Sequence, residues 1–123
     1  MTPTLFFVVT AVMEVGAGLA LLMAPALVIT FLFRATEIQT GVAMGRLAGA
    51  ALLSLGAASW WARHDGGSAA SRGLMGGLLI YNIAVVALVL SATFGSLGPP
   101  LWTLVAVHGV MALWGVWSLR LRE

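Results

Sequence analysis

The chain lacks cysteine and lysine, and it has very little charge of either sign. All six basic residues are arginine, four residues are acidic, and only 8% of the 123 residues are charged. The missing cysteines exclude disulfides, thiolate metal sites and cysteine redox motifs. A soluble domain typically has about 25% charged residues. The scarcity of charge therefore excludes an ordinary soluble domain.

The isoelectric point of about 10.6 does not indicate nucleic-acid binding. The net charge is only +2, and the arginines are scattered and form no basic run. The sequence also has no phosphate-binding loop, nucleophile elbow or paired carboxylates. Glu37 and Asp65 fall in polar segments and are expected to be solvated. We therefore predict a protein that is not an enzyme and has neither catalytic residues nor a metal site.

The chain has long apolar runs in place of charge. It is 61% hydrophobic, with a mean hydropathy of +1.06. A helix needs about 20 mostly apolar residues to cross the hydrocarbon core of a bilayer. Four runs have this length, at residues 4–24, 40–61, 73–92 and 101–119. We therefore predict an all-α, integral membrane four-helix bundle that forms a single domain over residues 1–123.

The breaks between these runs have ordinary turn chemistry. Pro25 interrupts the first run, residues 63–68 are polar and glycine-rich, and residues 95–100 end in two prolines that can begin the fourth helix. The segment 26–33 is apolar but too short to span a bilayer alone. It either extends a tilted first helix or lies along the interface after a bend at Pro25, and we favour the bend.

Arginine positions predict the orientation in the membrane. With four spans, both termini and the second loop lie on the same side, which holds Arg63, Arg72, Arg120 and Arg122. The other side holds Arg34, together with Arg46 if its side chain reaches outward. The positive-inside rule therefore places both termini in the cytoplasm. We predict a multi-pass protein of the bacterial inner membrane. An inner aromatic belt would comprise Trp60, Trp61, Trp114 and Trp117, with Trp102 at the outer side.

Small residues predict which helix faces pack together, because they let backbones approach closely in lipid. The second span has glycines four residues apart, with one more two turns later, at Gly41, Gly45, Gly49 and Gly56. The third span begins with Gly73 and Gly77 at the same spacing. Glu14 shares a face with Thr10, Ala11, Ala17 and Gly18, and His108 shares one with Ala112 and Gly115.

Each span contains one polar or ionisable residue, namely Glu14, Arg46, Asn82 and His108 in chain order. A charge at the bilayer centre costs roughly 2.5–3.5 kcal/mol, so such residues usually face inward and mark function. From a rise of about 1.5 Å per residue, all four lie between the midplane and the outer surface. Glu14 and Arg46 are then expected to pair, and Asn82 and His108 to complete a hydrogen-bonded set with Tyr81 beside them.

Other interpretations of these residues remain open. A buried Glu–Arg pair can serve only to fix helix register, and Arg46 can instead extend to the outer head groups. Haem between two histidines is disfavoured, because His64 lies at the inner surface and differs in depth from His108 by at least about 12 Å. Glu14 and His108 alone are too few ligands for a catalytic metal.

The stretch Gly45-Arg46-Leu47-Ala48-Gly49, with Gly56 further along, resembles the opening of DoxX-like four-helix membrane proteins. The size and four-span plan are also similar over nearly the whole chain. In that family the motif usually opens the first span, whereas here it opens the second. The resemblance implies a compact four-helix bundle, often an accessory or quinone-linked subunit of a redox complex.

The first span is similar to another family. Ala11-Val12-Met13-Glu14-Val15-Gly16 resembles the helix that bears the essential glutamate of small multidrug resistance transporters, which are also four-span chains. The resemblance implies that Glu14 binds either protons or a cationic drug. The third span departs from that family, because it lacks the expected aromatic-Ser-Gly pattern.

These observations leave three hypotheses for function. The first is a non-enzymatic protein that binds a lipophilic ligand, quinone or lipid, at Glu14, Arg46, Tyr81, Asn82 and His108, or acts as a small accessory subunit. Its partners would be membrane lipids, with a homodimer or another membrane protein as further candidates, and it would need no cofactor beyond the bound quinone or lipid. The second is a proton-coupled small-molecule transporter that uses Glu14 in a dimer. The third is a structural bundle that docks onto partner helices.

Overall fold

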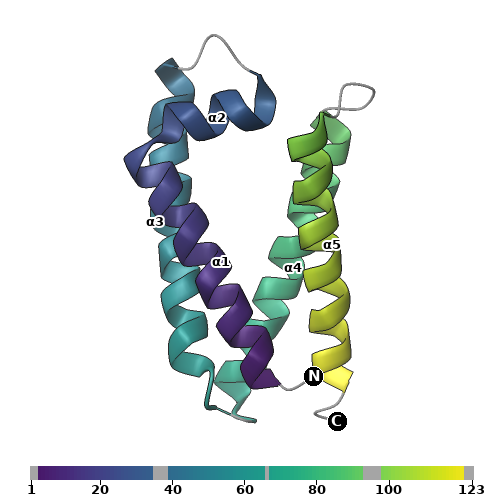
Figure 1. The fold of residues 1–123 in the computed structure, drawn as a ribbon. Helices are drawn as coiled ribbons and strands as arrows, with labels where there is room; N and C mark the ends of the chain where they lie inside the picture. Colours follow the sequence, from purple (N-terminus) through teal and green to yellow (C-terminus); the bar gives the residue numbers. More distant parts are fainter. Residues whose placement is uncertain (1–2, 35–38, 66, 93–97, 121–123) are drawn as a thin grey trace. The chain divides into compact units, whose positions relative to one another are not determined.

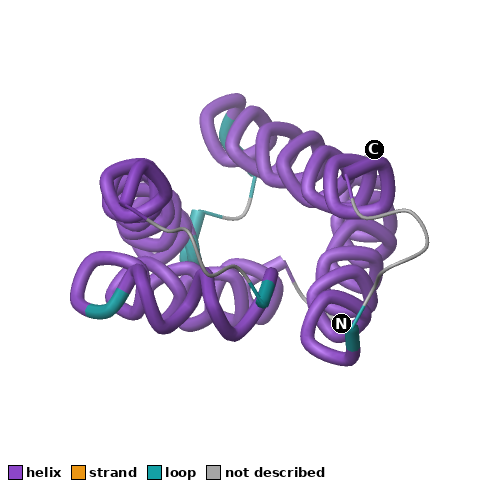
Figure 2. Tube along the Cα trace, turned by 90° about the horizontal axis from the view of Figure 1, so that it is seen from above, coloured by secondary structure: helices purple, strands orange, loops and turns teal. Residues whose placement is uncertain are grey.

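The structure is a computed structural model that describes residues 3–34, 39–65, 67–92 and 98–120 of the chain. The described residues are helical apart from short segments at the helix ends, shown in teal in Figure 2. Figure 1 shows the five helices among them, α1 (Pro3–Met23), α2 (Pro25–Phe33), α3 (Gln39–Ala62), α4 (Ala69–Ala92) and α5 (Pro99–Arg120). The all-α prediction is confirmed.

Four of these helices are long and apolar enough to cross a membrane. The candidate spans are Pro3–Met23, Gly41–Ala62, Ala69–Ser91 and Pro99–Arg120, so every predicted boundary lies within a few residues of the observed one. At about 1.5 Å per residue each helix is at least about 30 Å long, which matches the hydrocarbon core of a bilayer. Many large apolar side chains are exposed on them, as helices that face lipid require.

The chain divides into two compact units. One comprises residues 1–6 and 64–123 and is built on α4 and α5. The other comprises residues 7–63 and contains most of α1, together with α2 and α3. The arrangement of the four spans as a single domain stays a prediction.

Glycines bring α1 and α3 into close contact in the unit of residues 7–63. A Cβ atom at Gly18 would lie 2.8 Å from the carbonyl oxygen of Gly49, and one at Gly56 would lie 3.0 Å from the backbone nitrogen of Val15. The distance at Gly18 is shorter than real Cβ contacts, and the one at Gly56 is at their lower limit, so a larger residue at Gly18 would push the two backbones apart. The packing predicted for Gly49 and Gly56 is confirmed.

The packing predicted for the start of the third span is wrong. Nothing lies within 4 Å of a Cβ built at Gly73 or Gly77, and both residues are exposed. Their spacing matches that of the second span, but α4 buries its other side, with Met75 and Leu78. In contrast, Gly115 of α5 is buried against Leu79 and Phe6, as predicted for that face.

The chain bends between α1 and α2, as predicted for the segment that follows Pro25. Ala24 leaves the helical conformation, with φ −137° and ψ 54°, and α2 then runs across the end of α1 and α3 (Figure 1). Gly45 makes room for the bend, because a Cβ there would lie 3.1 Å from the Pro25 side chain. At its other end α2 stops at Arg34, which adopts a left-handed conformation with φ 51°.

The segment between α3 and α4 is held by its own side chains. Asp65 accepts a hydrogen bond from the backbone N–H of Ser68, at 3.1 Å, and another from the Ser68 hydroxyl. Ser68 in turn caps α4, because its Oγ accepts from the backbone N–H of Ser71 at 3.1 Å. Asp65 is therefore a structural residue of this turn, and the expectation that it is only solvated is wrong. Glu37 lies outside the described residues.

The glycine contact between α1 and α3 gives a testable prediction. Gly49→Ala should lower the free energy of unfolding by about 1–3 kcal/mol, because the new methyl group would meet backbone atoms of α1 at 2.8 and 3.0 Å. Gly77→Ala is the matched control, and it should leave the stability equal or slightly higher, since alanine favours helix. Unfolding of both variants in detergent, followed by circular dichroism, measures the difference. Equal stability of the two variants would contradict this account of the helix contact.

Candidate functional site

The interior of the unit of residues 1–6 and 64–123 is formed by one face of α4 and one face of α5. Buried residues recur on each helix at spacings of three, four or seven, which places them along a single face. On α4 they are Ser71, Met75, Leu78, Asn82 and Val89. On α5 they are Leu101, His108, Met111, Gly115 and Ser118. The two helices are antiparallel, since Asn82 meets His108 while the earlier Leu79 meets the later Gly115.

A hydrogen bond joins Asn82 and His108 in this interior. The distance between His108 Nδ1 and Asn82 Oδ1 is 2.8 Å. Both side chains are buried, with exposed fractions of 7% for His108 and 2% for Asn82. The amide nitrogen of Asn82 donates a second hydrogen bond, of 2.7 Å, to the backbone carbonyl of Leu78. The contact between Asn82 and His108 is therefore as the sequence predicted.

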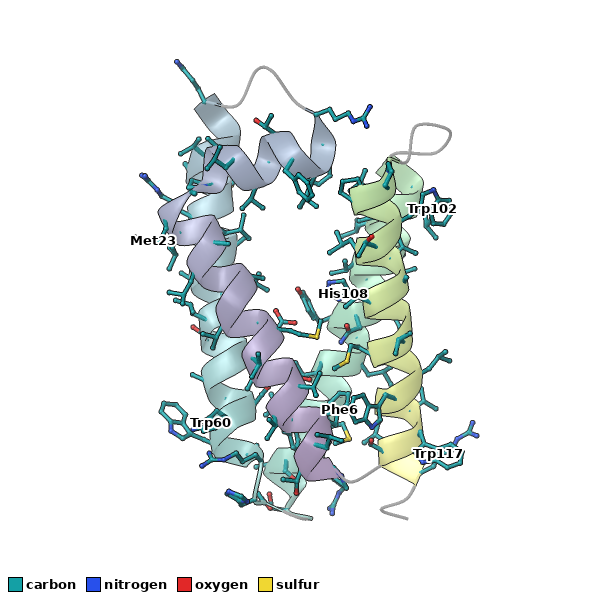
Figure 3. The ribbon with its side chains drawn as sticks, in the orientation of Figure 1. Phe6, Met23, Trp60, Trp102, His108 and Trp117 are labelled. Carbon is teal, nitrogen blue, oxygen red and sulfur yellow. The ribbon has the colours of Figure 1, made fainter. Side chains whose placement is uncertain are left out.

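Tyr81 completes the surroundings of the imidazole. The rings of Tyr81 and His108 meet edge to face, with centroids 5.5 Å apart and planes at 83°. This geometry is the favoured one for two aromatic rings and is worth roughly 0.5–1.5 kcal/mol beyond the buried area. Together with the hydrogen bond to Asn82, it fixes the orientation of the His108 ring, which Figure 3 labels on α5.

The cluster of Tyr81, Asn82 and His108, here named the His108 cluster, lies near the middle of its two helices. Asn82 is about 20 Å along the helix axis from the start of α4 at Ala69, and about 15 Å from its end. His108 is about 14 Å from the start of α5 and about 18 Å from its end. These lengths place the His108 cluster deep within both candidate spans.

Glu14 is buried in α1, with an exposed fraction of 5%. Thr10, Ala11 and Gly18 of the predicted small-residue face are also buried, whereas Ala17, which was predicted on the same face, is exposed. Glu14 belongs to the unit of residues 7–63, whereas the His108 cluster belongs to the other unit. The membership of Glu14 in one site with His108 therefore stays a prediction.

The predicted pairing of Arg46 with Glu14 is wrong. The register of α1 on α3 is given by Gly56, which meets Ala11 and Val15, and by Gly45, which meets Leu21 and Pro25. Glu14 is therefore level with the last third of α3, near Gly56, whereas Arg46 is level with the end of α1. The two levels differ by about 13 Å along the axis.

The cause of this difference is α2. The first turns of α3, at Gly41 and Gly45, pack against Ile29 of α2 and extend beyond α1, so depths counted from the ends of the two helices do not correspond. Arg46 is also exposed. Its exposure agrees with the other expectation, in which its side chain extends to the outer head groups. A role of Arg46 in ligand binding stays a prediction, and Glu14 is not its partner there.

Sequence reasoning missed two buried polar groups on α5. Trp114 Nε1 and Ser118 Oγ are buried and have no hydrogen-bond partner among the described residues. The Trp114 ring packs edge to face on Phe6, with centroids 5.7 Å apart, and its place in an aromatic belt stays a prediction. The spacing from His108 through Gly115 to Ser118 was the available signal. The other four tryptophans are exposed, and Figure 3 shows Trp102 and Trp117 projecting outward from α5.

Comparison of the chain with protein-family models, with curated proteins and with solved structures finds no match. The resemblances to DoxX-like proteins and to small multidrug resistance transporters therefore stay predictions.

The hydrogen bond between Asn82 and His108 can be measured by a double-mutant cycle. Asn82→Leu or His108→Leu alone should destabilise the protein by about 1–3 kcal/mol, because each leaves a buried polar group without its partner. The double variant should be less destabilised than the sum of the two, with a coupling of about 0.6–1.7 kcal/mol, the range found for polar contacts between membrane helices. Unfolding in detergent or mixed micelles measures all four free energies.

The control for this cycle pairs Asn82→Leu with Val110→Leu, since Val110 is on α5 but 61% exposed. That pair should be additive within about 0.5 kcal/mol. Additive effects of the Asn82 and His108 substitutions themselves would show that the two side chains do not interact in the folded protein.

Proposed function

We propose that this protein is a non-enzymatic, multi-pass protein of the bacterial inner membrane that binds the polar head of a lipophilic ligand, quinone or lipid, at the His108 cluster. The observation behind the proposal is the buried hydrogen bond between His108 and Asn82 near the middle of two candidate spans. Ligand sites are mostly apolar and contain a few convergent polar groups, which describes the surroundings of His108. Binding of this kind also suits a small accessory subunit of a membrane complex.

Energetic cost supports a functional role for the His108 cluster. A polar group without a partner in the hydrocarbon core costs several kcal/mol. Two apolar side chains of similar volume would pack α4 on α5 without this cost, so helix packing alone does not require an Asn–His pair. Intramembrane ionisable residues are rare and usually mark a ligand or ion pathway. The alternative is that the pair only fixes the register of α4 on α5.

The orientation is part of the proposal. Arg63 and Arg72 flank the turn between α3 and α4, and Arg120 ends α5. If these ends share one side of the membrane, the positive-inside rule makes that side, and both termini, cytoplasmic. Trp60 lies at the same end of α3, where Arg63 stacks on its ring at 3.9 Å. Tryptophan and arginine together are typical of a membrane–water interface.

The second candidate function is a proton-coupled transporter that uses Glu14 in a dimer. The burial of Glu14 within a candidate span favours it, because a buried carboxyl group can exchange a proton or a cationic substrate. Substrate-driven proton flux in proteoliposomes that is abolished by Glu14→Gln and unaffected by His108→Leu would favour this function over the first.

Ligand retention tests the first proposal. The full chain, purified from its membrane in lipid nanodiscs, should retain a quinone or a specific lipid at close to one molecule per chain. His108→Leu should reduce the retained ligand by about tenfold, the effect of about 1.4 kcal/mol of binding free energy. Organic extraction followed by mass spectrometry measures the amount.

The matched control is His64→Gln, since His64 is exposed and lies outside the candidate spans. This variant should retain as much ligand as the unaltered protein. Equal retention by the His108→Leu variant, at the same level of folding, would contradict the proposal.

A further inference from the structure

The hydrogen bonds around Asn82 determine which of its amide atoms faces His108. The backbone carbonyl of Leu78 can only accept a hydrogen bond, so the Asn82 group 2.7 Å from it is the amide nitrogen. The reversed amide would place two oxygen atoms against each other in a buried site. The atom that Asn82 presents to His108 is therefore Oδ1, which can only accept.

This arrangement fixes the proton on the imidazole. Because Asn82 Oδ1 is an acceptor 2.8 Å away, His108 Nδ1 must carry a hydrogen and donate it. A doubly protonated ring would bury a full positive charge against a neutral amide within an apolar pair of helices, which is unfavourable. The neutral ring then has no hydrogen on Nε2, and this nitrogen presents a lone pair.

His108 Nε2 is thus an acceptor deep within a candidate span. Among the described residues, the hydrogen bond of His108 runs through Nδ1 and its ring contact is with Tyr81. The side chain is 93% buried, and lipid chains offer no donor to satisfy the lone pair. Ester carbonyls and quinone carbonyls are acceptors as well, so neither can bond to Nε2. A ligand with a donor hydrogen can do so.

We propose that the site at His108 selects a lipophilic ligand with a hydroxyl donor, which hydrogen-bonds to Nε2, over the corresponding ligand that can only accept. This inference rests on the proposed function and specifies its ligand. A hydroquinone is therefore preferred to its quinone, and a lipid with a free alcohol to one with only ester groups. Phenolic and alcoholic hydroxyls share this chemistry, and the experiment below separates them.

Matched pairs of probes test the inference on the full chain in nanodiscs. 4-Octylphenol and 4-octylanisole differ only in the methyl group that removes the donor, and 1-decanol and decyl methyl ether form the alcoholic pair. Calorimetric titration gives each dissociation constant, and titration of His108→Leu nanodiscs corrects for partition into lipid. The hydroxyl probe should bind at least about tenfold more tightly than its ether, as one good hydrogen bond requires. A preference in the phenolic pair alone identifies a phenol-type ligand, and one in the alcoholic pair alone identifies a lipid alcohol.

Two variants connect the preference to the geometry. Asn82→Leu removes the acceptor that holds the proton on Nδ1, so the ratio between hydroxyl and ether should fall toward one while binding remains. His64→Gln should leave the ratio unchanged. Should the Asn82 variant fail to fold, the ratio in the unaltered protein decides the matter alone.

The outcomes separate the inference from the proposed function. Binding that depends on His108, but is equal or tighter for the ethers, overturns the donor preference and leaves ligand binding intact. No binding of any probe above the His108→Leu level overturns the proposed function and the inference with it. A hydroxyl preference that His108→Leu abolishes supports both.

Discussion

The hydrogen bond between His108 and Asn82 is the interaction on which the unit of α4 and α5 depends. It joins the two helices near their middle, where a shift of either helix by one residue would separate the two polar groups in an apolar interior. It also fixes the imidazole that Tyr81 contacts edge to face, and it determines which ring nitrogen has the proton. Helix register, ring orientation and the ligand chemistry open to His108 therefore follow from one contact.

The unit of residues 7–63 depends on close backbone contact. Gly18 and Gly49 bring α1 onto α3 at a distance that no other residue permits. Gly56 packs tightly on Val15, and Gly45 accommodates the bend at Pro25. The bend sends α2 across the ends of α1 and α3, and it offsets one helix relative to the other. That offset separates Arg46 from the level of Glu14. A short apolar helix thus decides which polar residues of this unit can meet.

Much of this structure could be predicted from the sequence, because the relevant signals are local. Each span is a run of apolar residues whose length is set by the thickness of the bilayer. Pro25 predicts the bend that follows the first span. Asn82 and His108 could be paired by counting residues, since Asn82 is ten residues before the end of α4 and His108 is nine residues after the start of α5. The same calculation failed for Arg46. The bend and α2 let α3 begin beyond the end of α1, and a count of residues does not give the size of this offset.

Features that depend on helix rotation could not be predicted. Gly73 and Gly77 have the same spacing as Gly45 and Gly49, yet they are exposed, because the apolar residues of α4 that find partners lie on its other side. The position of Trp114 near a helix end predicts a place in an aromatic belt but not the ring that it contacts. Trp114 packs against Phe6, since it lies on the inner side of α5 between Met111 and Ser118. Sequence spacing gives a face but not the neighbour that the face meets.

The most direct test of this account is the ¹⁵N nuclear magnetic resonance spectrum of the His108 imidazole in lipid bilayers. The chain has two histidines, so in the His64→Gln variant His108 is the sole source of imidazole nitrogen signals. The account predicts a neutral ring that has its proton on Nδ1 and none on Nε2. The Nδ1 proton should be hydrogen-bonded to the Asn82 side chain. A ring with its proton on Nε2, or with both nitrogens protonated, would contradict it.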